Sequence, residues 1–286
     1  YIMNILSLFD GISCGRVALE RAGVKVDNYF SSEIDEYAIK ISRFNHDDVK
    51  QIGNVLNLNT DVLPPIDLVI GGSPCQGFSF AGKGLAFDDP RSRLFFEFVD
   101  ILDRCKPKYF LLENVRMKQE FVDIITEYLD VQPILINSSL VSAQSRQRYY
   151  WTNIPNVGPP EDTCKEVLQD VLEPRPSRKY LAGQQLRDNY EGGNQLNPSY
   201  KSQANRIHDI DKKSPTIMAG SHGYANGYVN QDGDIRKLTP IECERLQTLP
   251  DNYTDGVSDT QRYKGLGNGW TVDVVAHIFR QMRGDT

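Results

Sequence analysis

Segments typical of strands alternate with segments typical of helices over the first 150 residues of the chain. Strand-like segments lie at 4–9, 26–33, 66–70, 108–115 and 133–141. Helix-like segments lie between them, at 16–22, 35–44, 92–105 and 121–129. Alternation at these lengths predicts βαβ units, and therefore an α/β fold with a mainly parallel sheet.

The composition changes after residue 153. Residues 155–235 are rich in Gly, Asn, Pro, Ser and Tyr and contain only short apolar runs. Simple disorder is one interpretation, but the tyrosines together with Ile207, Ile217 and Met218 favour a small, loop-rich domain. Regular patterns return at 237–250, where Thr239 and Pro240 have the order of an N-cap and a first helical residue.

The closing segment 271–282, TVDVVAHIFRQM, has the pattern of a helix that returns to the first sheet. We therefore predict a discontinuous catalytic and cofactor-binding domain, residues 1–153 plus 265–286. The predicted second domain is 154–264.

The segment FDGISCG, residues 9–15, joins the first strand to the first helix. Glycines in such a turn let a ligand approach the backbone, and the helix N-terminus offers N–H groups. Glu33 follows 22 residues after Gly11, at the end of the next strand, where an acidic residue typically holds a ribose diol. The phosphate-binding glycine motifs are absent, which indicates a nucleoside ligand without a pyrophosphate. A glycine turn beside an ordinary surface glutamate is the alternative.

A second set of residues indicates covalent chemistry. Cys75 stands in GGSPCQGFS directly after the strand-like DLVI, and Glu113 ends a later strand. Carboxyl ends of parallel strands share one edge of a sheet, so both side chains can face one crevice. Arg146 and Arg148 alternate in QSRQR, which places them on the same side of an extended segment. Each motif alone is ordinary, and the combination suits a cysteine nucleophile with a lowered pKa.

Cysteine use, charge and hydropathy narrow the class of protein. The five cysteines are scattered without a CxxC pair, so we predict neither a metal site nor a disulfide framework, and a reducing cytoplasm fits. No apolar run approaches the length of a membrane span, and no leader is visible. The net charge is −6, so nucleic-acid binding would need a local basic patch.

Four motifs resemble those of DNA (cytosine-5)-methyltransferases, in the family's order and spacing from residue 4 to about 280. They are PCQ around Cys75, ENV from Glu113, QSRQR, and the closing GLGNGWTVDVV. FDGISCG resembles the family's cofactor loop, and 236–251 resembles the segment that braces its variable recognition region. Segments such as 142–153 are similar to the de novo class of vertebrate enzymes, although a compact prokaryotic or phage enzyme is the better match.

The resemblance implies a Rossmann-like S-adenosylmethionine-dependent methyltransferase sheet with a smaller, loop-rich target-recognition domain. Its cofactor would be S-adenosyl-L-methionine and its partner double-stranded DNA; we expect a cytoplasmic protein, with a monomer slightly favoured. The implied catalytic residues are Cys75, Glu113, Arg146 and Arg148. The implied cofactor residues are Phe9, Asp10, Gly11, Ile12, Ser13, Cys14, Gly15, Glu33, Ile34, Asn54, Val55, Pro74, Asn268, Gly269 and Trp270. Candidates for target recognition are Gln76, Ser79, Thr216, Ser221 and His222.

In the implied mechanism the Cys75 thiolate adds to C6 of a flipped-out cytosine, so that C5 becomes nucleophilic. Glu113 would hydrogen-bond N3 and the exocyclic amine, while Arg146 and Arg148 would hold the thiolate and grip the base carbonyl or a phosphate. Two positions depart from the family pattern. Asn54 stands where Asp is usual, and Gly269 stands where Ser is frequent.

Two other functions stay open at this point. A catalytically silent paralogue would bind DNA or regulate a partner, but it would have no need of Cys75. An RNA cytosine-5 methyltransferase would share the same catalytic core, and the insert is the feature that favours duplex DNA. The recognition sequence, and whether a restriction enzyme accompanies the protein, do not follow from these residues.

Overall fold

The computed structural model describes residues 2–73, 93–188, 203–220 and 223–282. The chain divides into two compact units. Unit 1 consists of residues 1–137, 147–160 and 273–286, and unit 2 of residues 138–146 and 161–272. Among the described residues, no helix has the length and apolar character needed to cross a membrane.

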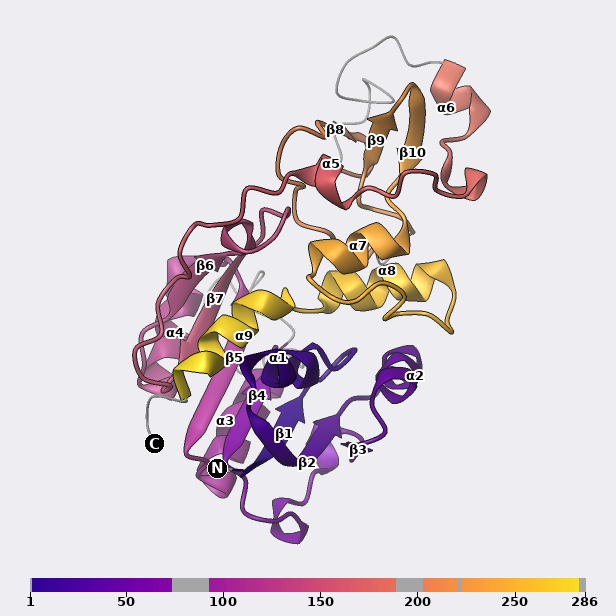
Figure 1. Cartoon of the computed structure of the whole chain (residues 1–286). Helices are drawn as coiled ribbons and strands as arrows, with labels where there is room; N and C mark the ends of the chain where they lie inside the picture. Colours follow the sequence, from indigo (N-terminus) through magenta and orange to yellow (C-terminus); the bar gives the residue numbers. More distant parts are fainter. Residues whose placement is uncertain (1, 74–92, 189–202, 221–222, 283–286) are drawn as a thin grey trace. The chain divides into compact units, whose positions relative to one another are not determined.

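Unit 1 is built on a seven-stranded sheet (Figure 1). Its strands are β1 (Ile2–Leu8), β2 (Lys25–Ser32), β3 (Val49–Gln51), β4 (Leu68–Gly71), β5 (Tyr109–Val115), β6 (Ile134–Asn137) and β7 (Gln147–Thr152). Their order in the sheet is β3-β2-β1-β4-β5-β7-β6. β1 to β5 pair in parallel, whereas β7 runs antiparallel to both β5 and β6. The predicted α/β fold with a mainly parallel, Rossmann-like sheet is confirmed.

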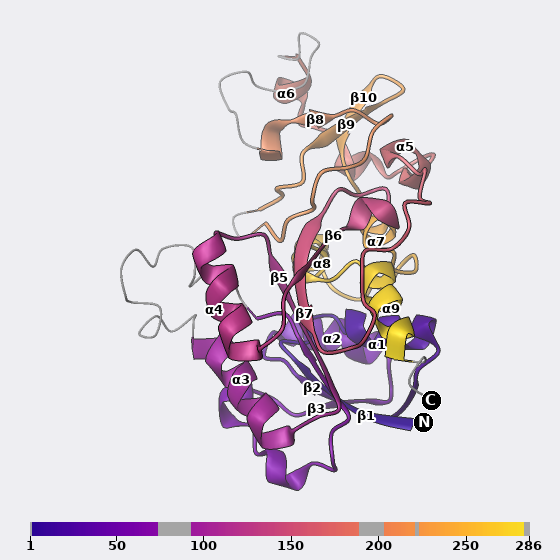
Figure 2. The same cartoon turned by 90° about the vertical axis from the view of Figure 1, so that its left-hand side faces the viewer.

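Helices cover both faces of this sheet (Figure 2). They are α1 (Cys14–Ala22), α2 (Glu36–Asn45), α3 (Arg93–Cys105), α4 (Gln119–Leu129) and α9 (Val272–Arg280), together with the short 3₁₀ turns η1 (Val55–Asn57) and η2 (Thr60–Val62). α3 and α4 lie on one face, and α1, α2 and α9 lie on the other. An ion pair of 2.9 Å between Arg21 of α1 and Asp273 of α9 joins the first and last helices of the unit.

Apolar spacing explains why these segments pack as they do. α3 buries Phe95, Phe98 and Ile101 at intervals of three residues, which form one stripe against the sheet. α1 ends at Gly23, which adopts the left-handed conformation with φ 66°. α2 begins at Asp35, whose carboxylate accepts from the N–H groups of the first turn. Local capping and burial therefore agree for these helices.

Unit 2 contains a three-stranded sheet of order β10-β9-β8 and several short helices. Its elements are η4 (Ser138–Leu140), α5 (Leu168–Val171), η5 (Arg178–Tyr180), α6 (Gln184–Asp188), η6 (Gln203–Asn205), β8 (Ile207–His208), β9 (Tyr228–Gln231), β10 (Asp234–Lys237), α7 (Pro240–Leu246) and α8 (Asp259–Asn268). The predicted start of α7 is confirmed, because Thr239 and Glu242 form a capping box and Pro240 occupies the first turn.

Two buried carboxylates hold α7 in unit 2. Glu242 forms a 2.7 Å ion pair with Arg236 of β10. Glu244 pairs with Arg262 of α8 at 2.8 Å and accepts from the backbone N–H of Thr254. Removing one member of such a pair leaves an unpaired buried charge, which costs about 3–5 kcal/mol. The segment 236–251 therefore links β10, α7 and α8 into one body.

Several elements differ from those that the sequence predicts, and β3 and β7 are not among the predicted strand segments. The predicted strand 133–141 is shorter, because only 134–137 pair in the sheet and residues 138–140 form a 3₁₀ turn. α8 was missed, because its glycines at 265 and 267 resemble a loop. The division by contacts assigns residues 265–272 to unit 2. The extent of the catalytic domain as 1–153 plus 265–286 stays a prediction.

Gly267 gives a stability prediction for unit 2. A Cβ atom at this position would lie 2.1 Å from the backbone nitrogen of Ala219. We expect Gly267→Ala to lower the free energy of unfolding by about 2 kcal/mol, despite the higher helix propensity of alanine, because the clash is with backbone. Urea denaturation measures this. Gly183→Ala is the control, since a Cβ there meets nothing within 4 Å. Equal stabilities of the two variants would contradict the prediction.

Candidate active site

Glu113 and Arg148 form an ion pair across neighbouring strands of unit 1. Glu113 lies near the end of β5, and β7 places Arg148 opposite Val115. Arg148 Nε lies 2.9 Å from Glu113 Oε1, with both side chains mostly buried. The pair is shielded from water, so its attraction is stronger than that of a surface pair. The sequence singled out both residues, but it did not predict that they pair with each other.

The end of β5 is also tied to the segment that follows β4. The Asn114 side-chain amide donates to the backbone oxygen and the hydroxyl of Ser73, each at 3.3 Å. β4 and β5 are parallel neighbours, so their carboxyl ends meet at one edge, as predicted. Ser73 is the last described residue before the 74–92 segment. The predicted site residues Pro74, Cys75, Gln76 and Ser79 lie outside the described residues.

The turn between β1 and α1 has an unusual backbone. Phe9, Gly11 and Ser13 all have positive φ angles, of 56°, 59° and 60°. Such angles are uncommon for Phe and Ser, and surrounding contacts have to stabilise them. Ile12 is buried in the turn itself, and Cys14 and Gly15 are buried at the start of α1. The turn is therefore a fixed loop, with its backbone at the sheet edge.

Asp10 holds this loop in place. Its carboxylate accepts hydrogen bonds from Ser7 Oγ and Ser13 Oγ, both at 2.5 Å, from Tyr29 Oη at 2.7 Å and from Ser31 Oγ at 2.8 Å. Desolvation raises the pKa of this carboxyl above its usual 3.8, although the four hydroxyl donors oppose the shift. The sequence assigned Asp10 to the cofactor directly and missed its partners. The two-residue spacing of Tyr29 and Ser31 on β2 was the available signal.

The pKa of Asp10 gives a pH prediction. The folded carboxyl binds its proton more tightly than the unfolded one, so Asp10 adds most to stability at low pH and less as pH rises above 3.8. We expect the free energy of unfolding of the wild type, minus that of Asp10→Asn, to fall between pH 4 and pH 7. Urea denaturation of both proteins at each pH measures the difference. When both proteins also carry Ser13→Ala, which removes one hydrogen-bond donor to Asp10, this fall should be steeper. A difference that stays constant or rises with pH would refute the assignment.

Glu33 closes the same loop from the end of β2. Its Oε2 accepts from the backbone N–H of Gly11 at 2.7 Å. Its Oε1 accepts from the N–H groups of Ile34 at 2.7 Å and Asp35 at 2.9 Å. The predicted acidic residue is therefore held rigidly beside the glycine turn, and its contact with a ribose diol stays a prediction.

Other predicted cofactor residues of unit 1 have apolar or amide side chains. Ile34 is 72% exposed, Phe9 is half-buried and Val55 is buried. The side chain of Asn54 caps η1, because its Oδ1 accepts from the N–H of Leu56 at 3.0 Å. The sequence predicts Asn54 as a cofactor residue, and its side-chain oxygen already has an internal donor. A contact of Asn54 with the cofactor therefore stays a prediction.

Arg146 lies in unit 2, where it has partners of a different kind from those of Arg148. Its guanidinium donates to the carbonyl oxygens of Ile217, Gly267 and Gly269, each at 3.0 Å, and the residue is buried. Arg146 thus joins the segment before β7 to the 217 loop and the end of α8. Its predicted contact with the cysteine or the base stays a prediction.

The remaining predicted residues of unit 2 are at the end of α8 and in the 214–228 segment. Asn268 is exposed, Gly269 is buried and Trp270 is half-buried. The Thr216 hydroxyl donates to the carbonyl of Ser145 at 2.9 Å, so its proton is already used in a hydrogen bond within unit 2. The predicted recognition residues Ser221 and His222 lie outside the described residues.

The sheet order, the fixed β1–α1 loop and the acidic residue that follows β2 are those of a Rossmann-like methyltransferase fold. Residues 3–284 match the model of the C-5 cytosine-specific DNA methylase family. The chain belongs to this family, and the protein is a DNA methyltransferase of the cytosine-5 class.

Curated relatives and solved structures agree with this placement. The chain is 31% identical to the Type II methyltransferase M1.ScrFI of Lactococcus lactis subsp. cremoris, over 98% of this chain and 77% of that protein. It is 30% identical to the Type II methyltransferase M.NlaX of Neisseria lactamica, over 99% of this chain and 96% of that protein. The Entamoeba histolytica methyltransferase EhMeth has the same fold, with a TM-score of 0.82, 19% identity and coverage of 100% of this chain and 99% of that one.

Proposed function

We propose that this protein transfers a methyl group from S-adenosyl-L-methionine to C5 of a flipped-out cytosine in duplex DNA, through a covalent bond between Cys75 and C6. The observation that carries the proposal is the buried Glu113–Arg148 pair at the end of β5. It lies at the edge where Asn114 holds Ser73, two residues before Cys75. The carboxyl group and the guanidinium therefore lie near the last described residue before the segment that contains the proposed nucleophile.

The roles of Glu113 and Arg148 follow from their geometry. Arg148 faces one carboxylate oxygen of Glu113, and no described residue hydrogen-bonds to the other oxygen, Oε2. A carboxyl group held in this way can face N3 and the exocyclic amine of cytosine with both positions of its fork. A proton on the Glu113 carboxyl, donated to N3, would then neutralise the negative charge that develops there when the thiolate adds to C6, while the other carboxyl oxygen accepts from the exocyclic amine.

The residues around the β1–α1 loop suit S-adenosyl-L-methionine, which supplies the methyl group when bound. Glu33 presents a carboxylate to a ribose diol beside a loop that contains no phosphate-binding motif. Phe9 and the exposed Ile34 offer apolar surfaces for the adenine ring. These residues bind and orient the nucleoside. Asp10 keeps the loop backbone in the conformation that it needs.

C6 of a paired cytosine is inaccessible to a side chain, because the base is stacked inside the helix. The target nucleotide therefore has to leave the duplex before Cys75 can reach it. The names of the relatives, Type II methyltransferases, favour a role in restriction and modification inside a bacterial cell. We propose a cytoplasmic location on the same ground.

Methyl transfer from labelled cofactor tests the proposal. Duplex DNA should accept label and transfer RNA should not, and bisulfite sequencing of DNA from an expressing host should locate 5-methylcytosine in one short sequence. Label on transfer RNA alone would favour the RNA methyltransferase. DNA binding without any transfer would favour the silent paralogue.

A further inference from the structure

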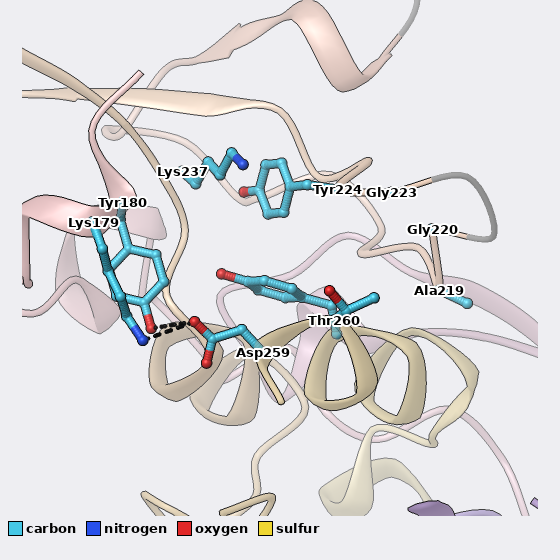
Figure 3. A pocket seen from close by; sticks show the side chains of 10 residues that line it. Lys179, Tyr180, Ala219, Gly220, Gly223, Tyr224, Lys237, Asp259 and Thr260 are labelled. Atoms are coloured by element: carbon cyan, nitrogen blue, oxygen red, sulfur yellow. Dashed lines mark hydrogen bonds and ion pairs between the residues drawn. The ribbon is translucent and has the colours of Figure 1, made fainter. Parts of the chain in front are cut away.

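Unit 2 contains a cavity of about 200 Å³ that the proposed catalytic chemistry does not use. Four parts of unit 2 line it: η5, residues 219–220 with 223–224, the end of β10 and the first turns of α8 (Figure 3). Its side chains include Lys179, Tyr180, Tyr224, Lys237, Asp259 and Tyr263. Lysines and aromatic rings in one cavity suggest a ligand with an anionic group and a flat or apolar portion.

The charges in the cavity leave one lysine without a counterion. Asp259 pairs with Lys179 at 2.9 Å and accepts from the Tyr180 hydroxyl at 3.1 Å (Figure 3). This contact raises the pKa of Lys179, which keeps its charge. Lys237, by contrast, has no carboxylate within ion-pair distance among the described residues, and its ammonium lies 5.1 Å from the centre of the Tyr224 ring. The cavity therefore carries a net positive charge.

The hydroxyl groups of Tyr224 and Tyr263 already have hydrogen-bond partners, and the rings of these tyrosines form a wall of the cavity. Tyr224 Oη accepts from the Leu238 N–H at 2.8 Å, and Tyr263 Oη donates to the Leu238 carbonyl at 2.6 Å. Burial raises the pKa of both tyrosines, so they stay neutral. Their rings meet edge to face at 5.0 Å. A ligand would therefore meet fixed aromatic surfaces beside the Lys237 ammonium.

We propose that this cavity binds the backbone of one nucleotide of the DNA substrate, with its phosphate at Lys237 and the attached sugar against Tyr180 and Tyr224. This inference rests on the proposed function, which brings DNA to the protein. Lysine is a common ligand of backbone phosphates, and the sugars beside them offer an apolar surface to an aromatic ring. A carboxylate ligand would satisfy the lysine but would leave the aromatic wall unused.

Binding of duplex DNA to Lys237 variants tests the phosphate contact. We expect Lys237→Gln to raise Kd about 3- to 10-fold at 0.1 M salt, and to reduce the slope of log K against log salt by about 0.9, the value for one phosphate. Lys237→Arg keeps the positive charge, so it should restore most of the affinity and most of the salt slope. The control is Lys212→Gln, which removes an exposed lysine that is paired with Asp209 elsewhere in unit 2. Its slope should change less than that of Lys237→Gln, and equal changes would count against the cavity.

Methylphosphonate scanning of the duplex locates the contact. One uncharged linkage should weaken binding of the wild type but not of Lys237→Gln, because the variant has already lost that interaction. If every linkage affects both proteins equally, the inference is wrong. Inorganic phosphate or a free nucleotide that raises Tm through Lys237, without any such linkage, would identify a small-anion site and overturn it too. Methylation of DNA by the same proteins is measured in parallel. If the wild type methylates DNA but Lys237 has no effect on binding, only this inference fails; if it does not methylate DNA, the proposed function fails.

Discussion

DNA that carries 5-fluorocytosine at the target position should become covalently attached to Cys75. If the Cys75 sulfur adds to C6 before methyl transfer, C5 receives its methyl group while the sulfur–carbon bond is intact. Release of Cys75 then requires removal of a proton from C5, and fluorine cannot leave as a proton. The adduct should survive denaturant, depend on S-adenosyl-L-methionine and map to a peptide that contains residue 75.

Cys75→Ala should abolish both the adduct and turnover, while binding of DNA and cofactor persists. Cys164→Ala is the control, because Cys164 is a free, half-buried cysteine that lies in unit 2. It should trap DNA at the wild-type rate. If Cys75 only fills a turn, the Cys75→Ala variant will methylate DNA at a near-normal rate. Adducts at Cys14, Cys105, Cys164 or Cys243 would refute the assignment in a different way.

The parts of the fold that were predictable are those that local patterns determine. α3 is predictable because its three buried apolar residues repeat at helical spacing. α7 is predictable because Thr239 and Pro240 mark its first turn. α8 is not, because it is rich in glycine and its close packing at Gly267 depends on residues about fifty positions earlier in the chain. Contact with a distant segment decides that element, and no local pattern reports such contact.

The same distinction applies to the site. Glu113 lies near the end of a strand and Glu33 follows one, so the rule that parallel strands share one carboxyl edge places them at that edge. Arg146 and Arg148 are two residues apart, and the alternation of an extended segment predicts similar surroundings. The structure gives Arg148 a carboxylate and Arg146 three carbonyl oxygens, one of them 71 residues later in the chain and two of them more than 120. Long-range packing therefore separates two residues that sequence alone treats as equivalent.

Glu113→Gln should reduce the rate of methyl transfer by about 10²- to 10⁴-fold, the usual contribution of acid–base assistance. The amide keeps the size and hydrogen-bonding capacity of the side chain, but it cannot share a proton with N3, and it loses the ion pair of 2.9 Å with Arg148. Binding of DNA should change far less than kcat, because the missing interaction develops mainly in the transition state. Single-turnover kinetics with labelled cofactor measures the rate.

Arg148→Gln and the double variant show whether the two residues act as one unit. If Arg148 orients Glu113 through their contact, the double variant should be about as slow as Glu113→Gln alone, because there is no carboxylate left to orient. Arg104→Gln is the control. It removes a guanidinium that pairs with Asp100 and Glu97 on α3 of the same unit, and it should leave the rate nearly unchanged. Independent effects of the two substitutions, with losses that multiply in the double variant, would mean that Arg148 contacts the substrate separately. A near-normal rate for Glu113→Gln would remove Glu113 from the mechanism.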